Sequence, residues 1–229
     1  MFKRVTALLP MRHDSKRVIG KNYRPIGGKL LYQHILDTLL RIPEITQVVI
    51  DTDSPILKES LREHYPKVAV IDRPSDLCAD TVPMNTILLY DTAQCEADLF
   101  LQTHSTNPLL SADTISRALK AFKEAWPRYD SLMGVNRYQS RFWTADGKPI
   151  NHDPAIMLRS QDLKPVYEDN SCIYLFTREN LVKYGSRVGQ TPLLFEVPKL
   201  ESQDIDEEED FTLAEMLIAA RDRTKEKDN

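Results

Sequence analysis

Long hydrophobic runs are missing from this sequence of 229 residues. No segment approaches the roughly 18 apolar residues that a membrane span needs, and the N-terminal MFKRVTALLP has too short an apolar run for a signal-peptide core. Excess positive charge is also missing: the net charge is −4, which argues against a general nucleic-acid binder. We therefore expect a cytoplasmic protein with no nucleic-acid or membrane partner, in which any anion site is local.

Cysteine is scarce, and several common catalytic patterns are absent. Three widely spaced cysteines make neither a disulfide framework nor a zinc pattern, so buried thiols are expected. The sequence has no Walker A loop, no GxGxxG turn and no spacing that suggests a Ser-His-Asp or Cys-His arrangement. Without repeats or a flexible linker, residues 1–229 are expected to form a single domain.

Short apolar runs alternate with stretches of helical spacing in the first half, which predicts an α/β fold with a parallel sheet. The predicted strands are Val5 to Leu9, Val48 to Asp51, Val68 to Ile71 and Leu99 to Gln102, and the predicted helices are Leu30 to Leu40, Pro55 to Glu63, Met84 to Gln94 and Thr114 to Ala125. Ligands of such sheets lie beyond the carboxyl ends of the strands. The loops 11–28, 73–83 and 103–111 are therefore expected to converge on one site.

In the second half of the sequence the regular alternation of strand and helix patterns ends. Residues 131–169 read as a strand, a turn at Asp146-Gly147 and an aperiodic stretch, which suggests an arm inserted in the domain. Strand character returns at Ile173 to Phe176 and Leu193 to Val197. Phe211 to Ala220 is an amphipathic pattern, which predicts a helix ahead of a frayed charged tail.

The segment LLPMRHDSKRVIGKN, from Leu8 to Asn22, is the clearest candidate for a polyanion site. An apolar strand opens there into a loop that carries cations and a hydroxyl, at Arg12, Ser15, Lys16, Arg17 and Lys21. Charge that builds up on transferring phosphoryl oxygens needs fixed cations and donors of this kind. A solvated basic loop is the competing interpretation of the same composition.

Asp204 and Asp206 alternate along the chain before the last predicted helix, so an extended backbone would project them to the same side. Mg²⁺ takes one or two carboxylates together with phosphate oxygens and water, which makes this pair a candidate metal site. Alternatively, the acidic run 201–210 favours a helix N-terminus electrostatically. His104, near the end of the fourth predicted strand, is either a polar contact or base in the pocket or a structural histidine.

Taken together, these segments resemble the CMP-sialic acid synthetases, or acylneuraminate cytidylyltransferases. LLPMRHDSKRVIGKN resembles the family signature P-A-R-G-G-S-K-G-x-P-x-K-N, and further matches follow in order along nearly the whole chain. These are Gly28-Lys29-Leu30 (G-K-P), Asp51-Thr52-Asp53 (S-T-D), Arg73-Pro74 with Asp80 (R-P-x-x-L-A-x-D), Thr106 to Leu109 (T-S-P-L), Asn170 to Tyr174 (N-G-A-I-Y) and Asp204 to Phe211 (D-I-D-T-E-E-D-F).

The resemblance implies a Rossmann-like nucleotidyltransferase fold and a Mg²⁺-dependent transfer. The anomeric hydroxyl of an acidic sugar would attack the α-phosphorus of CTP, giving a CMP-sugar and pyrophosphate, with Arg12, Lys21 and Asp206 as catalytic residues. The implied binding residues fall into three groups: Arg12, Ser15, Lys16, Lys21, Asn22, Arg73 and Asp80 for the nucleotide; His104, Thr106, Asn107, Tyr167 and Asn170 for the acceptor; and Asp204 and Asp206 for the metal.

The resemblance also implies a homodimer in which the arm reaches the neighbouring subunit. Departures from the family pattern put two regions in question: His13-Asp14 replaces Gly-Gly in the phosphate loop, and Glu168-Asp169 replaces Arg-Pro beside the acceptor. An inward-pointing Glu168 would repel an acceptor carboxylate. The paired nucleotide and metal motifs make a sialic, legionaminic or pseudaminic acid the leading acceptor class, and the altered acceptor half leaves Kdo or a phosphonate open as the acceptor. A nucleotide-binding module that has lost catalysis is the alternative to an enzyme.

Overall fold

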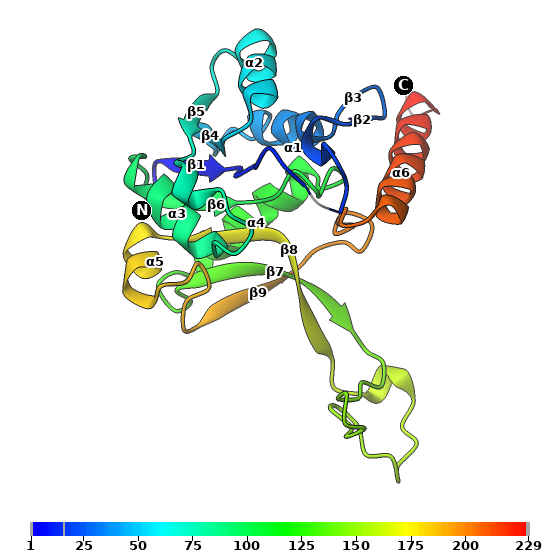
Figure 1. Ribbon diagram of the computed structural model, residues 1–229. Coiled ribbons are helices and arrows are strands. Elements are labelled where there is room, and N and C mark those ends of the chain that lie inside the picture. Colours follow the sequence, from blue (N-terminus) through cyan, green and yellow to red (C-terminus); the bar gives the residue numbers. More distant parts are fainter. Residues whose placement is uncertain (1, 16, 228–229) are drawn as a thin grey trace.

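A seven-stranded sheet in the order β5-β4-β1-β6-β8-β7-β9 runs through the protein, as seen in a computed structural model that describes residues 2–15 and 17–227 (Figure 1). Strands β1 (Val5–Leu8), β4 (Gln47–Thr52), β5 (Ala69–Asp72) and β6 (Leu99–Gln102) are mutually parallel. The strand β8 (Val166–Phe176) is antiparallel to β6, β7 (Ser131–Tyr138) is antiparallel to β8, and β9 (Pro192–Glu196) is parallel to β7. The predicted α/β class with a mainly parallel sheet is confirmed.

Helices cover both faces of the sheet because successive strand residues alternate between two apolar cores. Val5 and Ala7 of β1 pack with α1 (Leu31–Leu40), α2 (Pro55–His64) and α4 (Ala112–Ala125) in one cluster. Leu8 points to the other face, where it packs with Leu88 of α3 (Met84–Ala93) and Leu181 of α5 (Arg178–Tyr184). Both faces of β1 are therefore buried, as in a doubly covered sheet.

The parallel strands deliver three loops to one edge of the sheet. The chain leaves β1 into the loop that contains Arg12, leaves β5 into Arg73, and leaves β6 into His104. Short elements shape these loops, namely the 3₁₀ turns η1 (Lys21–Tyr23) and η2 (Ser75–Leu77) and the hairpin β2 (Pro25–Ile26) and β3 (Lys29–Leu30). The predicted convergence of loops at the carboxyl ends of the strands is therefore observed.

The last helix, α6 (Glu208–Lys227), lies beside the domain and carries the acidic segment to the same edge (Figure 1). Ile205, Phe211, Ala214 and Ile218 pack with Val18 of the phosphate loop in a small apolar cluster. The predicted end of this helix at Ala220 is wrong, because the helix continues through Lys227, and residues 228–229 of the predicted frayed tail lie outside the described residues. Helices are often longer than their amphipathic part, since polar residues extend them on the solvent side.

The two long strands β7 and β8 continue out of the domain and carry an irregular tip between them (Figure 1). The tip contains an isolated bridge between Trp143 and Pro149, the 3₁₀ turn η3 (Ser160–Asp162), and Gly147 with φ +77°. That positive φ fits the predicted turn at Asp146-Gly147, because glycine adopts it without steric cost. No helix in the described part of the chain is long and apolar enough to cross a membrane.

Candidate active site

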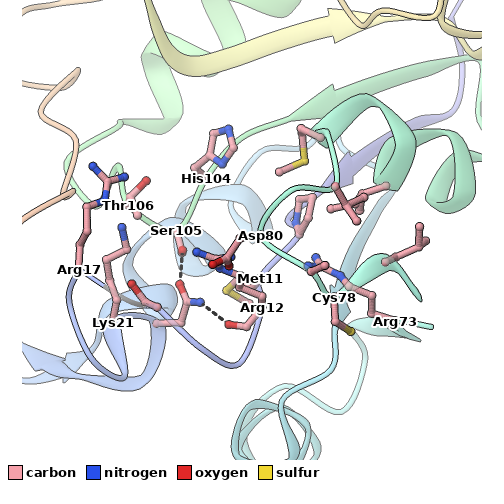
Figure 2. A pocket seen from close by; sticks show the side chains of 18 residues that line it. Met11, Arg12, Arg17, Lys21, Arg73, Cys78, Asp80, His104, Ser105 and Thr106 are labelled. Carbon is pink, nitrogen blue, oxygen red and sulfur yellow. Dashed lines mark hydrogen bonds and ion pairs between the residues drawn. The ribbon is translucent and has the colours of Figure 1, made fainter. Parts of the chain in front are cut away.

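A cavity of about 310 Å³ opens at the carboxyl edge of the parallel strands (Figure 2). Among the described residues of its wall, four are cations, Arg12, Arg17, Lys21 and Arg73, and one is a carboxylate, Asp80. Ser15, Asn22, His104 and Thr106 also line it. In a chain whose net charge is −4, this local excess of positive charge makes the cavity suited to a polyanion.

The phosphate loop is held in shape by its own polar side chains. Asn22 is buried, its Nδ2 donates to the Arg12 carbonyl at 3.0 Å, and its Oδ1 accepts a hydrogen bond of 2.5 Å from the Ser105 hydroxyl. Arg12 forms an ion pair with Asp80 across the cavity. Asn22 thus ties the phosphate loop to the loop after β6. Lys16, which the sequence assigned to the triphosphate, lies outside the described residues.

The substituted Gly-Gly pair does not fill the cavity. His13 turns toward the loop after β4, where its Nδ1 is 2.8 Å from the Ser54 hydroxyl and its backbone N–H donates to Asp53 at 2.7 Å. Its ring also stacks on Tyr23 with the ring centroids 5.8 Å apart. The bulk that replaces glycine is therefore accommodated outside the site. Gly20 remains indispensable, because its φ is +66° and a Cβ there would lie 2.7 Å from the Tyr23 ring.

Arg73 is held by the buried carboxylate of Asp51, beside which lies a second buried acid. Its Nε donates to Asp51 Oδ2 at 3.0 Å, and the side chains of this pair are 4% and 1% exposed. Asp91 lies beside Asp51, and burial followed by the Asp51 charge raises the pKa of Asp91 to about 8. A proton retained between the two carboxyls leaves one negative charge to balance the Arg73 guanidinium. Because the folded pKa is raised, this proton stabilises the fold at low pH, and that contribution is lost as pH rises toward about 8.

Lys21 is the point at which the phosphate loop meets the acidic segment. Its Nζ donates to the Ile205 carbonyl at 2.6 Å and lies 3.6 Å from Asp206 Oδ1, which also accepts from Arg17 at 2.8 Å. Burial lowers the pKa of Lys21, while the charges of Asp206 and Asp204 oppose that shift. Burial also raises the pKa of Asp204. The predicted encounter between the cationic loop and the acidic pair is therefore observed.

The donor chemistry of this acidic pair fits a magnesium ion. Asp204 and Asp206 offer carboxylate oxygens on either side of Ile205, whose buried side chain fixes that segment. No group of three or more acidic, histidine or cysteine side chains that could hold a metal occurs among the described side chains of residues 2–15 and 17–223. That finding is compatible with Mg²⁺, which typically takes one or two carboxylates and completes its shell with substrate phosphate and water.

The structure places some of the predicted acceptor residues at the cavity and the others away from its wall. His104 and Thr106 line the cavity, whereas Asn107 is completely buried behind it. Asn170 is also buried, with its Oδ1 accepting from the Cys172 N–H at 3.1 Å and its Nδ2 donating to Asn136. Tyr167 lies farther out on β8, opposite Arg137 of β7. Neither Tyr167 nor Asn170 belongs to the cavity wall, so their acceptor roles stay predictions.

Glu168, which would repel an acceptor carboxylate if it pointed into the site, forms hydrogen bonds to β7 instead. Its Oε2 accepts from Asn136 Nδ2 at 3.0 Å and from the Tyr138 hydroxyl at 2.9 Å, both on the neighbouring strand β7. It does not line the cavity. The acidic charge is therefore held by strand-to-strand hydrogen bonds away from the site.

Sequence reasoning placed Arg17 in the polyanion loop without predicting its pairing with Asp206, and it assigned no site role to Asp51 or Asp91. Arg17 lines the cavity and pairs with Asp206. Asp51 could have been found, because it lies near the end of a buried strand inside the segment that resembles S-T-D. Asp91 gave no signal, since it lies in the last turn of the helix α3 and only the fold brings it to Asp51.

Comparison with known proteins decides the family. The model of the family described as cytidylyltransferase matches residues 6–225. The chain belongs to the cytidylyltransferase family. CMP-N,N'-diacetyllegionaminic acid synthase of Legionella pneumophila is 28% identical over 228 residues, covering 94% of this chain and 96% of that protein. The N-acylneuraminate cytidylyltransferase of Streptococcus agalactiae serotype V is 25% identical over 89% of this chain and 51% of its own length.

A solved structure supports the same fold for this cytidylyltransferase. CMP:2-keto-3-deoxy-manno-octonic acid synthetase complexed with CTP superposes with a TM-score of 0.72 at 16% identity, covering 95% of this chain and 99% of that one. The predicted Rossmann-like nucleotidyltransferase fold is confirmed, and with the family membership so is the prediction of a nucleotidyltransferase.

Proposed function

We propose that this cytidylyltransferase couples CTP to a nonulosonic acid, giving a CMP-sugar and pyrophosphate. The observation that carries the proposal is the meeting of the cationic loop and the acidic pair at Lys21, beside a cavity walled by four cations. The acceptor class is supported by two relatives, whose names specify a diacetyllegionaminic acid and an N-acylneuraminate. A cytoplasmic location, where CTP is available, accords with this activity.

In the proposed reaction Arg12, Ser15 and Lys16 hold the triphosphate, while Lys21 stands near the α-phosphate. Its short bond to the Ile205 carbonyl and its burial fix the ammonium before substrate arrives. Such preorganised charge costs little reorganisation when negative charge develops in the transition state. Asn22 and Arg73 contact the cytidine. Asp80 holds Arg12 in an ion pair until a phosphate group takes the place of the Asp80 carboxylate.

A bound Mg²⁺, held by Asp204 and Asp206, would act as a Lewis acid on the phosphate oxygens. Asp206 already carries two cationic neighbours, Arg17 and Lys21. These contacts hold the Asp206 carboxylate against the cationic loop. Asp204 is the more buried of the two carboxyls, and its proximity to Lys21 opposes the effect of burial on its pKa.

An assay of pyrophosphate release tests the function. We expect Mg²⁺-dependent release with CTP and at least one sialic, legionaminic or pseudaminic acid, and a decrease of at least about 100-fold when UTP replaces CTP or EDTA removes the metal, since a catalytic metal contributes several kcal/mol. Kdo and a phosphonate serve as the alternative acceptors. Tight CTP binding without turnover on the whole panel would favour the module that lacks catalysis.

We also propose that the arm forms a homodimer interface. Its tip exposes large apolar side chains that the rest of the chain does not cover, namely Trp143, Ile150, Ile156, Met157 and Leu158. Contiguous exposed apolar surface commonly marks a protein interface. Sedimentation velocity is expected to give twice the chain mass of 26.4 kDa, and Met157→Glu to lower that dimer fraction. A wild-type monomer at micromolar concentration would refute this assembly.

A further inference from the structure

Beside the cavity, side chains from two separate segments of the fold form a chain of hydrogen bonds. Arg187, in the loop between α5 and β9, donates through a guanidinium nitrogen to Gln102 Oε1. Gln102 ends β6 and is completely buried, and its Nε2 lies 3.0 Å from His104 Nε2. His104 lines the cavity, whereas Arg187 does not. None of the proposed contacts to CTP uses Arg187 or Gln102.

Arg187 is itself fixed in place. Its guanidinium carbon lies 3.5 Å from the centroid of the Tyr174 ring, and its backbone N–H donates to Asn85 Oδ1 at 3.1 Å. The Tyr174 hydroxyl in turn donates to Asp169 at 2.6 Å. Stacking on an aromatic face suits a planar guanidinium and restricts its rotation. The direction in which Arg187 donates is therefore set by contacts outside the cavity.

The bond from Arg187 to Gln102 determines which atoms donate and which accept in the other hydrogen bonds of this series. A guanidinium has donors only, so the atom of Gln102 that faces Arg187 must be the carbonyl oxygen. The amide nitrogen then faces His104 and the Thr103 carbonyl, to which it donates at 2.9 Å. A flipped amide would set N–H groups against the guanidinium. The usual ambiguity of a glutamine side chain is thus removed.

His104 Nε2 must accept, because the group that faces it is an amide N–H donor. The imidazole is therefore neutral with its proton on Nδ1, since a proton on Nε2 would meet the Gln102 amide. The electrostatics agree: removal of the ring from water, followed by the charges of Arg187 and Lys21, lowers the pKa of His104 to about 3. Among the described residues, none forms a hydrogen bond with His104 Nδ1, and the ring borders the cavity.

We propose that Arg187 is a positioning residue which, through Gln102, holds His104 as a neutral imidazole that donates a hydrogen bond from Nδ1 to an oxygen of the acceptor sugar. The same arrangement excludes His104 as a general base, because one ring nitrogen is occupied by Gln102 and the other already carries a proton. The statement that the receiving oxygen belongs to the acceptor sugar rests on the proposed function, whereas the statement about the tautomer of His104 does not.

Nitrogen-15 NMR of the full-length enzyme, labelled at histidine, measures the tautomer without substrates. The His104 signals are assigned by their loss in His104→Asn. At pH 7.5 we expect His104 to show an unprotonated Nε2 and a protonated Nδ1. His34 supplies an internal reference of opposite tautomer, because its Nε2 lies 2.9 Å from the Ile26 carbonyl, which can only accept.

The hydrogen bonds from Arg187 through Gln102 to His104 are called the relay below. Two substitutions test whether the relay, rather than burial of the ring alone, sets the tautomer of His104. Gln102→Glu presents a carboxylate that accepts from both Arg187 and His104, so the His104 proton is expected to move to Nε2 and the pKa to rise. Arg187→Met frees the Gln102 amide to rotate and is expected to give a mixture of His104 tautomers. If the buried Gln102→Glu variant fails to fold, Arg187→Met alone tests the relay. Arg128→Met removes an exposed arginine that lies 5.6 Å over Tyr129, and is expected to leave His104 unchanged.

Kinetics test the donor role separately. Asparagine places its amide nitrogen the same number of bonds from Cα as Nδ1 of histidine, whereas leucine has no donor. We expect His104→Leu to raise the acceptor KM at least tenfold with the CTP KM within twofold, and His104→Asn to retain most of the affinity. A wild-type Nε2–H tautomer, or no change in both relay variants, would overturn the relay. Equal losses in the Asn and Leu variants would overturn the donor role, and an inactive wild-type enzyme would count against the proposed function alone.

Discussion

Asp206→Asn is expected to lower kcat by about 10²- to 10³-fold and to raise the Mg²⁺ concentration for half-maximal activity more than about tenfold, because one anionic oxygen ligand is lost where phosphoryl charge is stabilised. The substitution keeps the size of the side chain and its bond from the Arg17 guanidinium to Oδ1. Steady-state kinetics over a Mg²⁺ titration at saturating CTP measures both effects.

Arg17→Met is the matched control for Asp206→Asn. It breaks the same 2.8 Å ion pair from the other side but removes no carboxylate. We expect a higher CTP KM and a Mg²⁺ requirement within about threefold of wild type, since an exposed pair of this kind contributes about 1 kcal/mol or less. If both variants shift the Mg²⁺ requirement equally, Asp206 serves only to anchor the phosphate loop, and the metal assignment fails.

The fold could be predicted to this extent because its signals are local. The strand β1 and the helices α1 and α4 combine a continuous period with flanking turns, and their observed bounds differ from the prediction by two residues at most. The hairpin of β2 and β3 was not predicted, because strands of two residues carry no periodicity. The helix α5 was also missed, since its seven residues give barely two turns of pattern.

The candidate site was predictable where one segment carries several functional groups, and not where the fold assembles them from separate segments. Arg12, Lys21 and Asp206 lie in clusters of charge that the sequence displays directly. The relation of Asp91 to Arg73 depends on a helix crossing a strand end, and that of Arg187 to His104 depends on the loop before β9. Such pairings are properties of the tertiary structure and leave no spacing in the sequence.

Arg73→Met is expected to destabilise the protein by about 3–5 kcal/mol, which is the usual effect of removing one partner of a buried ion pair. The variant leaves the carboxylates of Asp51 and Asp91 buried with no cation opposite them. For a chain of this size, each kcal/mol lowers Tm by roughly 2–4 °C, so a decrease of about 10 °C should be seen by calorimetry. Arg117→Met, whose partner Asp113 is 80% exposed, is the control and should change stability by less than about 0.5 kcal/mol.

The pH dependence and a double mutant identify the cause of that loss. Burial already raises the pKa of Asp51, and loss of the guanidinium that opposes this shift raises it further, so the defect should shrink as pH falls from 8 to 5 and both carboxyls take up protons. Adding Asp51→Asn removes the uncompensated charge and is expected to restore at least about 2 kcal/mol, a coupling within the range measured for contacting residues. A double mutant no more stable than Arg73→Met would mean that lost packing of the arginine stem causes the defect. The shared-proton arrangement beneath the nucleotide pocket would then have to be abandoned.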